Sequence, residues 1–140
     1  MVDSTEDKRL KVLVVDDDPS IVTVVAEILR GEGFDVLEAT GGEQGLELAR
    51  MGSPDVVLLD IMMPDIGGFE VYRRLRLDPE IENIPVLFLT ASMKPEYISR
   101  SADIGVNGYI IKPFSPPALV NALKETYLLG GQSSIVLKSF

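Results

Sequence analysis

Residues 56–64 read VVLLDIMMP, and this stretch decides how the rest of the chain is interpreted. The four apolar residues from Val56 to Leu59 are typical of a strand that is covered on both faces, as in a parallel sheet. One proline and two glycines follow by residue 68, so we expect the strand to end near Asp60. Asp60 is thereby placed at the carboxyl end of a strand, where open α/β sheets carry their functional groups.

Apolar runs and helical periodicities alternate along the chain on both sides of this stretch. We predict strands at residues 10–15, 34–39, 56–60, 86–90 and 109–112, the second a candidate edge strand, and helices at residues 19–30, 43–51, 68–77, 94–103 and 116–129. Asp18 and Ser115 are suitable N-caps, and each precedes a proline that fits the first helical position. Residues 94–103 contain few apolar side chains, so we expect this helix to be weakly anchored.

Five strand–helix repeats predict an α/β fold, a doubly wound parallel sheet with helices on both faces. Right-handed crossovers bring the carboxyl ends of all the strands to one edge of such a sheet. The residues expected at that edge are polar: Asp16 and Asp17 after the first strand, then Asp60, Thr90 and Lys112. The sequence therefore predicts a polar site built from four strands.

Composition limits the chemistry that this site can perform. The chain has 140 residues, consistent with one domain, and contains neither cysteine nor histidine, which excludes disulfides, thiolate sites and imidazole ligands. The net charge of −9 argues against direct binding of nucleic acid. No stretch suggests a membrane span or a signal peptide, so we expect a cytoplasmic protein.

Three neighbouring carboxylates would repel one another unless a cation lay between them. Mg²⁺ suits such a site, because it binds one or two carboxylates and completes its coordination with water and phosphate oxygens. Asp60 could then act as a nucleophile in phosphoryl transfer, with Thr90 and Lys112 contacting phosphoryl oxygens. Taken singly, each residue also has a simpler interpretation: a solvated turn and helix cap at 16–18, a strand-end aspartate that starts a turn at Asp60, a strand end at Thr90, and an extended surface side chain at Lys112.

Four motifs in order resemble the receiver domain of bacterial two-component response regulators. They are VVDD at 14–17, LLDIMMP at 58–64, LTA at 89–91 and YIIKPF at 109–114, and the resemblance covers about residues 9–129. It implies a flavodoxin-like fold with five parallel strands in the order 2-1-3-4-5. Residues 1–8 are then expected to be a disordered N-terminus. Residues 130–140 are expected to be a C-terminal tail or linker stub, whether the domain stands alone or was cut from a longer regulator.

The resemblance also implies a role for each site residue. Asp60 would accept a phosphoryl group from a sensor histidine kinase or a phosphotransfer protein. Asp17, Asp60 and the main-chain carbonyl of Met62 would bind Mg²⁺ directly, while Asp16 would act mainly through metal-bound water. Thr90 and Lys112 would contact the phosphoryl group. The protein would not be a conventional enzyme, although it would catalyse its own phosphorylation and dephosphorylation.

The same resemblance implies a switch. Tyr109 matches an aromatic residue that turns inward as Thr90 moves toward the phosphate; a tyrosine packed on the last helix is the alternative. The Lys112–Pro113 bond is expected to be cis. The responding surface would be formed by residues 90–129 and would bind an output protein, an output domain or a second copy of the chain. Met62 and Ser92 occupy positions that flank the route of the attacking water in similar proteins. Because methionine cannot orient water by hydrogen bonding, we predict that the phosphorylated state of this protein lasts longer than that of a variant with asparagine at position 62.

Two other functions fit parts of the sequence. Residues 12–20 resemble the opening motif of haloacid-dehalogenase-type phosphatases, with Asp16 as nucleophile and Asp18 as acid or base, but no later pair of adjacent aspartates follows. A phosphorylation-independent interaction module of the same fold would retain the acidic pocket without using it.

Overall fold

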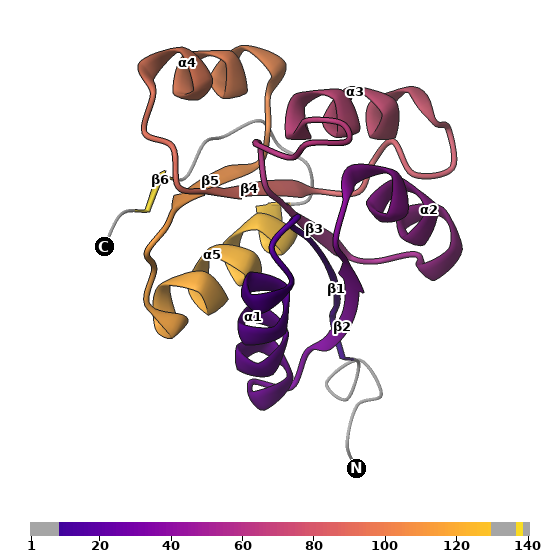
Figure 1. Ribbon diagram of the computed structural model, residues 1–140. Helices are drawn as coiled ribbons and strands as arrows, with labels where there is room; N and C mark the ends of the chain where they lie inside the picture. Colours follow the sequence, from indigo (N-terminus) through magenta and orange to yellow (C-terminus); the bar gives the residue numbers. More distant parts are fainter. Residues whose placement is uncertain (1–8, 130–136, 139–140) are drawn as a thin grey trace.

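The computed structural model describes residues 9–129 and 137–138, in which strands and helices alternate (Figure 1). The strands are β1 (Lys11–Val15), β2 (Asp35–Ala39), β3 (Val56–Leu59), β4 (Val86–Thr90), β5 (Gly108–Ile111) and β6 (Leu137–Lys138). The helices are α1 (Pro19–Gly31), α2 (Gly42–Gly52), α3 (Gly68–Leu77), α4 (Pro95–Ile104) and α5 (Pro116–Leu129). The ten elements predicted from sequence are all present, and no predicted bound differs from the observed one by more than one residue.

The strands form one parallel sheet in the order β2-β1-β3-β4-β5-β6. The predicted order of the first five strands is thus confirmed, and β2 lies at one edge. β6 was not predicted: it pairs with β5 through Tyr109 with Leu137 and Ile110 with Lys138. Two residues are too short a stretch to show a strand periodicity. The expectations for residues 1–8, and for 130–136 and 139–140, lie outside the described residues.

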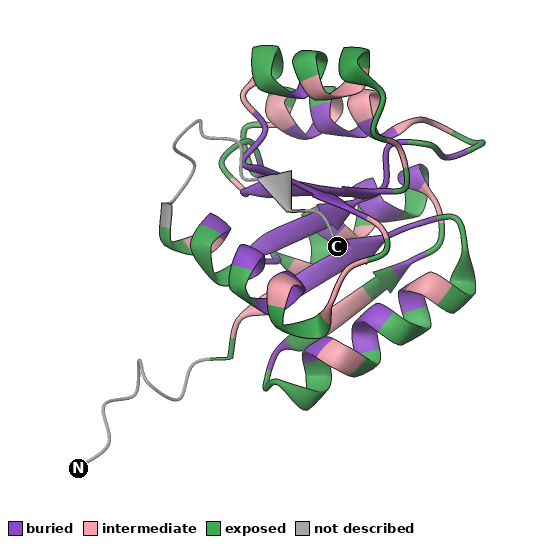
Figure 2. Cartoon of the chain, turned by 90° about the vertical axis from the view of Figure 1, so that its left-hand side faces the viewer, coloured by how far each residue is buried: buried purple, intermediate pink, exposed green. Residues whose placement is uncertain are grey.

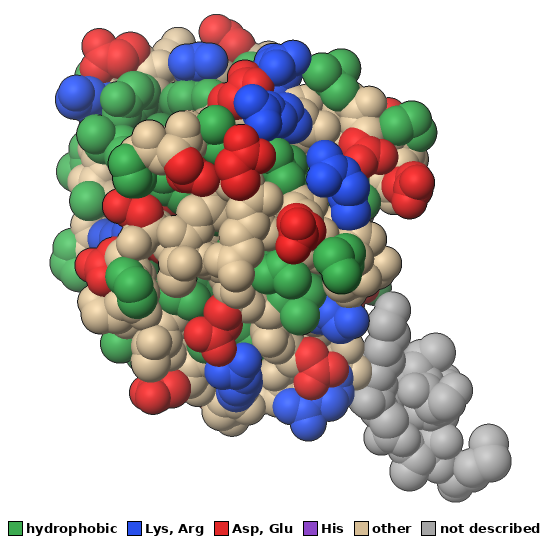
Figure 3. All heavy atoms as spheres, turned by 45° about the vertical axis from the view of Figure 1, so that its right-hand side comes forward, with side chains coloured by type: hydrophobic (Ala, Val, Ile, Leu, Met, Phe, Trp, Pro, Cys, Tyr) green, Lys and Arg blue, Asp and Glu red, His purple; other side chains and the backbone are tan. Residues whose placement is uncertain are grey.

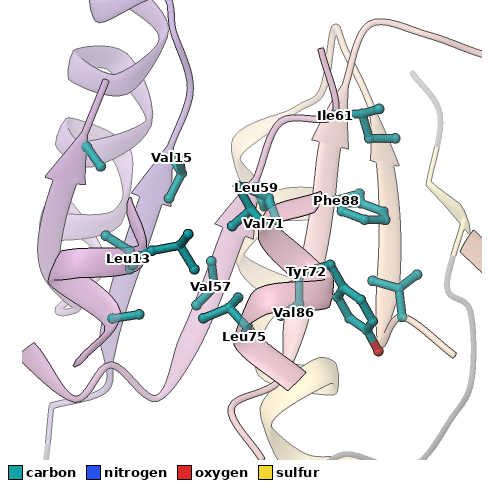
Figure 4. Packing of buried hydrophobic residues seen from close by; sticks show 14 of the residues in the cluster. Leu13, Val15, Val57, Leu59, Ile61, Val71, Tyr72, Leu75, Val86 and Phe88 are labelled. Atoms are coloured by element: carbon teal, nitrogen blue, oxygen red, sulfur yellow. The ribbon is translucent and has the colours of Figure 1, made fainter. Parts of the chain in front are cut away.

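Helices cover both faces of the sheet, as predicted. Alternate residues of each strand point to opposite faces, so Leu13 and Val15 belong to the cluster beneath α2, α3 and α4, whereas Val12 and Val14 belong to the cluster beneath α1 and α5. Figure 4 shows the first cluster: Val71, Tyr72 and Leu75 of α3 lie over Val57, Leu59, Val86 and Phe88 of the sheet. Apart from Lys11 at the start of β1 and Thr90 at the end of β4, strands β1, β3, β4 and β5 are continuous apolar runs, as expected of strands buried on both faces.

The predicted caps form. The Asp18 carboxylate accepts a hydrogen bond from the Ser20 amide at 2.9 Å, with Pro19 in the first turn of α1. The Ser115 hydroxyl accepts from the Ala118 amide at 3.2 Å at the start of α5. The expectation for α4 is also confirmed: Ser101 is its only buried residue, and Figure 2 shows the helix at the top almost entirely exposed or intermediate.

No helix in the described part of the chain is both long and apolar enough to cross a bilayer.

Candidate functional site

The carboxyl ends of four neighbouring strands bring the predicted residues together. Asp16 directly follows β1 and Asp60 directly follows β3; these strands pair through Val15 and Leu59, and the Asp60 amide donates to the Val15 carbonyl at 2.9 Å. Thr90 ends β4 beside Lys112, whose amide donates to the Thr90 carbonyl at 2.8 Å. Main-chain hydrogen bonds of the sheet therefore fix the spacing of the site.

Three carboxylates gather at this edge. One oxygen from each of Asp16, Asp17 and Asp60 lies within 4.8 Å of the others. Asp16 and Asp60 are buried, with 3% and 7% of their surfaces exposed, and Asp17 is exposed. Burial raises the pKa of Asp60 above its usual value; the Lys112 ammonium opposes this rise and the Asp16 carboxylate adds to it.

Lys112 contributes one positive charge among these carboxylates. Its Nζ lies 2.7 Å from Oδ2 of Asp16, and the two side chains are 17% and 4% exposed, so Lys112 is not an extended surface lysine. Asp16 also accepts a hydrogen bond from the Asp18 amide at 3.0 Å. The Lys112–Pro113 bond is cis, as the resemblance implied. With one ammonium for three carboxylates, the donor set is all oxygen and suits a hard divalent cation such as Mg²⁺.

Thr90 and Tyr109 both contact Ser92, in the loop between β4 and α4. The Thr90 hydroxyl accepts a hydrogen bond from the Ser92 amide at 3.4 Å, and the Tyr109 hydroxyl donates to the Ser92 carbonyl at 2.9 Å. Tyr109 is fully buried and packs edge-on against Phe88, at a ring separation of 6.3 Å, on the face that carries α3 and α4. It therefore does not pack on the last helix, which was the alternative interpretation.

Met62 lies beside Asp60 in the loop after β3. Its side chain is 56% exposed, and its main-chain amide hydrogen-bonds to the Asp60 carboxylate, which favours the charged form of Asp60 and acts to lower its pKa. The residues expected to act as acceptor, cation ligands, phosphoryl contacts and switch are thus adjacent in space, although their roles stay predictions.

Two residues that support the site were missed in the sequence. Gly68 begins α3 so close to the site that an added Cβ would lie 2.4 Å from the Asp60 carbonyl oxygen. Asp65 accepts hydrogen bonds from the amides of Gly42 and Glu43, at 3.2 and 3.0 Å, and caps α2 from a distant loop. Gly41, the N-cap residue of α2, has no side chain that could cap the helix. This feature of the sequence could have indicated that a side chain from elsewhere in the chain caps α2.

Asp18 is engaged away from the carboxylate cluster. Its Oδ1 accepts from both the amide and the hydroxyl of Ser20, at 2.9 and 2.7 Å, and these bonds lower its pKa. A carboxylate held ionised as a helix cap is poorly suited to act as a general acid. The geometry therefore gives no support to the phosphatase alternative, in which Asp18 would play that part.

Taken together, the fold and site define a class: doubly wound α/β domains with an acidic, lysine-containing pocket at the carboxyl edge of the sheet. Residues 12–124 match the family model described as the response regulator receiver domain. The chain belongs to this family, as its four motifs indicated.

Two of the similar proteins differ in how much of their own length this chain matches. The chain is 37% identical over 121 residues to the chemotaxis protein CheY-3 of Vibrio cholerae, covering 86% of this chain and 93% of that protein. It is 41% identical over 112 residues to the DNA-binding response regulator MtrA of Mycolicibacterium smegmatis, covering 80% of this chain. The chain spans about half of MtrA, since the match covers 48% of that protein.

Solved structures agree with the fold. Chemotaxis protein CheY4 of Vibrio cholerae superposes with a TM-score of 0.80 at 33% identity, over 85% of this chain and 99% of that one. A CheY-like receiver domain protein of Methanospirillum hungatei gives a TM-score of 0.80 at 28% identity, over 88% and 97% of the two chains.

Proposed function

We propose that this domain is a phosphorylation-dependent signalling switch in which Asp60 accepts the phosphoryl group. The observation that carries the proposal is the convergence of three carboxylates and a partly buried lysine at adjacent strand ends. Membership of the receiver family supports it, because that family serves two-component signalling.

The proposed donor is a sensor histidine kinase or a phosphotransfer protein. An oxygen of the Asp60 carboxylate attacks phosphorus, and the bond between phosphorus and the donor's imidazole nitrogen breaks; the electron pair stays on that nitrogen. The product is an acyl phosphate on Asp60, which water later hydrolyses to inorganic phosphate and the free carboxylate. Asp60 must be ionised to attack, so the lysine that lowers its pKa also favours the reactive form.

Asp16, Asp17, Asp60 and the main-chain carbonyl of Met62 would hold Mg²⁺. Bound there, the cation would supply positive charge to the phosphoryl oxygens. Lys112 would exchange part of its contact with Asp16 for a phosphoryl oxygen, and the Thr90 hydroxyl would donate to another.

Phosphorylation would act through α4. The phosphoryl group adds charge and three acceptor oxygens at the end of β3, and the Thr90 hydroxyl would turn toward it from the Ser92 amide. Tyr109 contacts the same residue through the Ser92 carbonyl, so a shift of this loop would change the packing of Tyr109 and of the weakly anchored α4. The responding surface would bind an output protein, an output domain or a second copy of the chain, without direct contact with nucleic acid.

The test is the intact mass of the protein after incubation with acetyl phosphate and Mg²⁺. We expect wild type to gain one phosphoryl group, EDTA to abolish the gain, and Asp60→Ala to gain none. An unchanged wild-type mass would contradict the proposal and favour a phosphorylation-independent module. A gain that persists in Asp60→Ala but disappears in Asp16→Ala would move the nucleophile to Asp16.

A further inference from the structure

A hollow between α3 and α4 lies outside the carboxylate site. Its volume is about 490 Å³, within the range of pockets that bind small molecules. It is lined by Phe69, Tyr72, Arg76 and Leu77 of α3 and by Arg100 and Ile104 of α4, among others. Phe69 and Arg100 separate it from a second hollow beside the loop at 61–64.

The charge of this hollow is opposite to that of the whole chain. Three arginines and one glutamate line it, in a protein whose net charge is −9. Glu70 is committed to two of its neighbours: Arg73 Nη2 lies 2.6 Å and Arg74 Nε 2.8 Å from Oε2, and these bonds lower the pKa of Glu70 to about 2. Two of the lining arginines, Arg76 and Arg100, keep their charge uncompensated, because no carboxylate in the described ranges forms an ion pair with them.

Both of these guanidinium groups are held in place by uncharged partners. That of Arg76 lies 4.5 Å from the centre of the Tyr72 ring and donates to the Tyr72 hydroxyl, the Ile84 carbonyl and the Asn107 side chain, at 3.2, 2.9 and 3.4 Å. That of Arg100 lies 4.1 Å from the centre of the Phe69 ring. Because Nε, Nη1 and Nη2 of Arg76 already donate, the guanidinium of Arg100, stacked on its ring, is the better placed to offer N–H groups to an anion.

Apolar surface accompanies the positive charge. Leu77 and Ile104, on opposite sides of the hollow, are 67% and 37% exposed, and the Phe69 ring is half-buried. Near the top of the view in Figure 3, basic side chains lie among hydrophobic and acidic ones. An occupant with an apolar body would cover Leu77 and Ile104 while its charged group reached Arg100.

We propose that this hollow binds a small amphipathic anion, a ring system that carries a carboxylate, sulfonate or phosphate. The proposal commits to a small molecule because the hollow is concave and of that size, and to an anion because of the uncompensated arginines. Such a ligand would bridge α3 and α4, whose direct links here include the Arg100–Phe69 contact and the hydrogen bond from the Tyr72 hydroxyl to the Ile104 carbonyl at 3.2 Å. Binding of this ligand does not depend on phosphorylation of Asp60.

The probe for the test is 8-anilinonaphthalene-1-sulfonate, titrated into ¹⁵N-labelled protein while amide chemical shifts are recorded. We expect saturable shifts at residues 69–77 and 100–105. The uncharged analogue N-phenyl-1-naphthylamine should bind at least about tenfold more weakly, the loss typical of one charge-assisted hydrogen bond. Equal binding of the two compounds would overturn the proposal, as would shifts centred on residues 61–64 or on α1 and α5.

Three variants sharpen the test. Arg100→Gln should weaken binding about tenfold because it removes the anchoring charge. Leu77→Ala removes exposed apolar surface and should weaken binding severalfold. Arg30→Gln, which loses one positive charge from α1 on the opposite face, should leave the affinity unchanged. Both substitutions in the hollow are at exposed positions, so the fold should persist; unchanged affinity in Arg100→Gln would refute the assignment.

Discussion

Replacing Asp60 with asparagine should stabilise the cation-free protein at neutral pH. Asp60 is 7% exposed, and its carboxylate lies within 4.8 Å of an oxygen of Asp16 and of Asp17. Two unit charges at this separation repel by roughly 1–3 kcal/mol for effective dielectric constants of about 80 to 20. The attraction of Lys112 offsets about one of the two repulsions. We therefore expect Asp60→Asn to raise the free energy of unfolding by about 1–3 kcal/mol at pH 7 in EDTA.

The pH dependence gives this prediction its sign. Because the folded-state pKa of Asp60 is raised above 3.8, the folded protein holds this proton more tightly than the unfolded chain. Asp60 therefore costs no stability below pH 3.8, and the cost grows as the pH rises from there through the folded pKa. The advantage of asparagine should therefore be larger at pH 7 than at acidic pH, and it should disappear near pH 3.5.

Urea unfolding across this pH range, with and without Mg²⁺, is the assay. Glu47→Gln, which removes one negative charge from an exposed position of α2, is the control and should change stability by less than about 0.5 kcal/mol. Saturating Mg²⁺ should stabilise wild type more than Asp60→Asn. An Asp60→Asn variant no more stable than wild type at pH 7, or one whose advantage persists undiminished at pH 3.5, would refute the reasoning.

Three further predictions concern single side chains. Thr126 on α5 is buried, and its hydroxyl has no hydrogen-bond partner among the residues that the structure describes. Thr126→Val should therefore raise the free energy of unfolding in urea by about 1 kcal/mol, whereas the control Thr23→Val, on the exposed face of α1, should change it little. A lower free energy of unfolding in Thr126→Val would contradict this prediction. Gly68→Ala should lower the free energy of unfolding in urea by about 2–3 kcal/mol, because the added Cβ would meet the Asp60 carbonyl oxygen. Gly31→Ala, whose added Cβ would have nothing within 4 Å, should not lower it. Equal effects of the two substitutions would contradict the packing argument. Met62→Asn should shorten the lifetime of the phosphorylated state severalfold, measured as the rate at which the phosphoryl mass is lost. The control Met51→Asn should leave that rate unchanged. Slower loss in Met62→Asn than in wild type would contradict the prediction.

The regularity of the chain explains how much of the fold the sequence predicts. Four strands are buried on both faces and are apolar except at Lys11 and Thr90, which lie at strand ends, and prolines and glycines mark most element ends. The site could also be predicted, because its residues lie at the carboxyl ends of these strands. In a parallel sheet those ends share one edge, so residues 16, 60, 90 and 112 must lie near one another.

What the sequence did not predict depends on contacts between distant segments. The cap that Asp65 places on α2 joins residues 23 positions apart, and the pairing of β6 with β5 follows no local pattern. The salt bridge between Lys112 and Asp16 is likewise a product of the folded geometry, since sequence directed Lys112 only toward the phosphoryl group. The hollow between α3 and α4 arises from side chains of two helices, neither of which is unusual by itself.

The most direct test of the account is to locate the phosphoryl group on the chain. The protein is incubated with acetyl phosphate and Mg²⁺, the acyl phosphate is reduced with borohydride, and the peptides are sequenced by mass spectrometry. We predict that residue 60 alone is converted from aspartate to homoserine, and only when Mg²⁺ is present. Conversion at Asp16, or a phosphorylated peptide that borohydride leaves unchanged, would contradict the central claim that Asp60 is the phosphoryl acceptor.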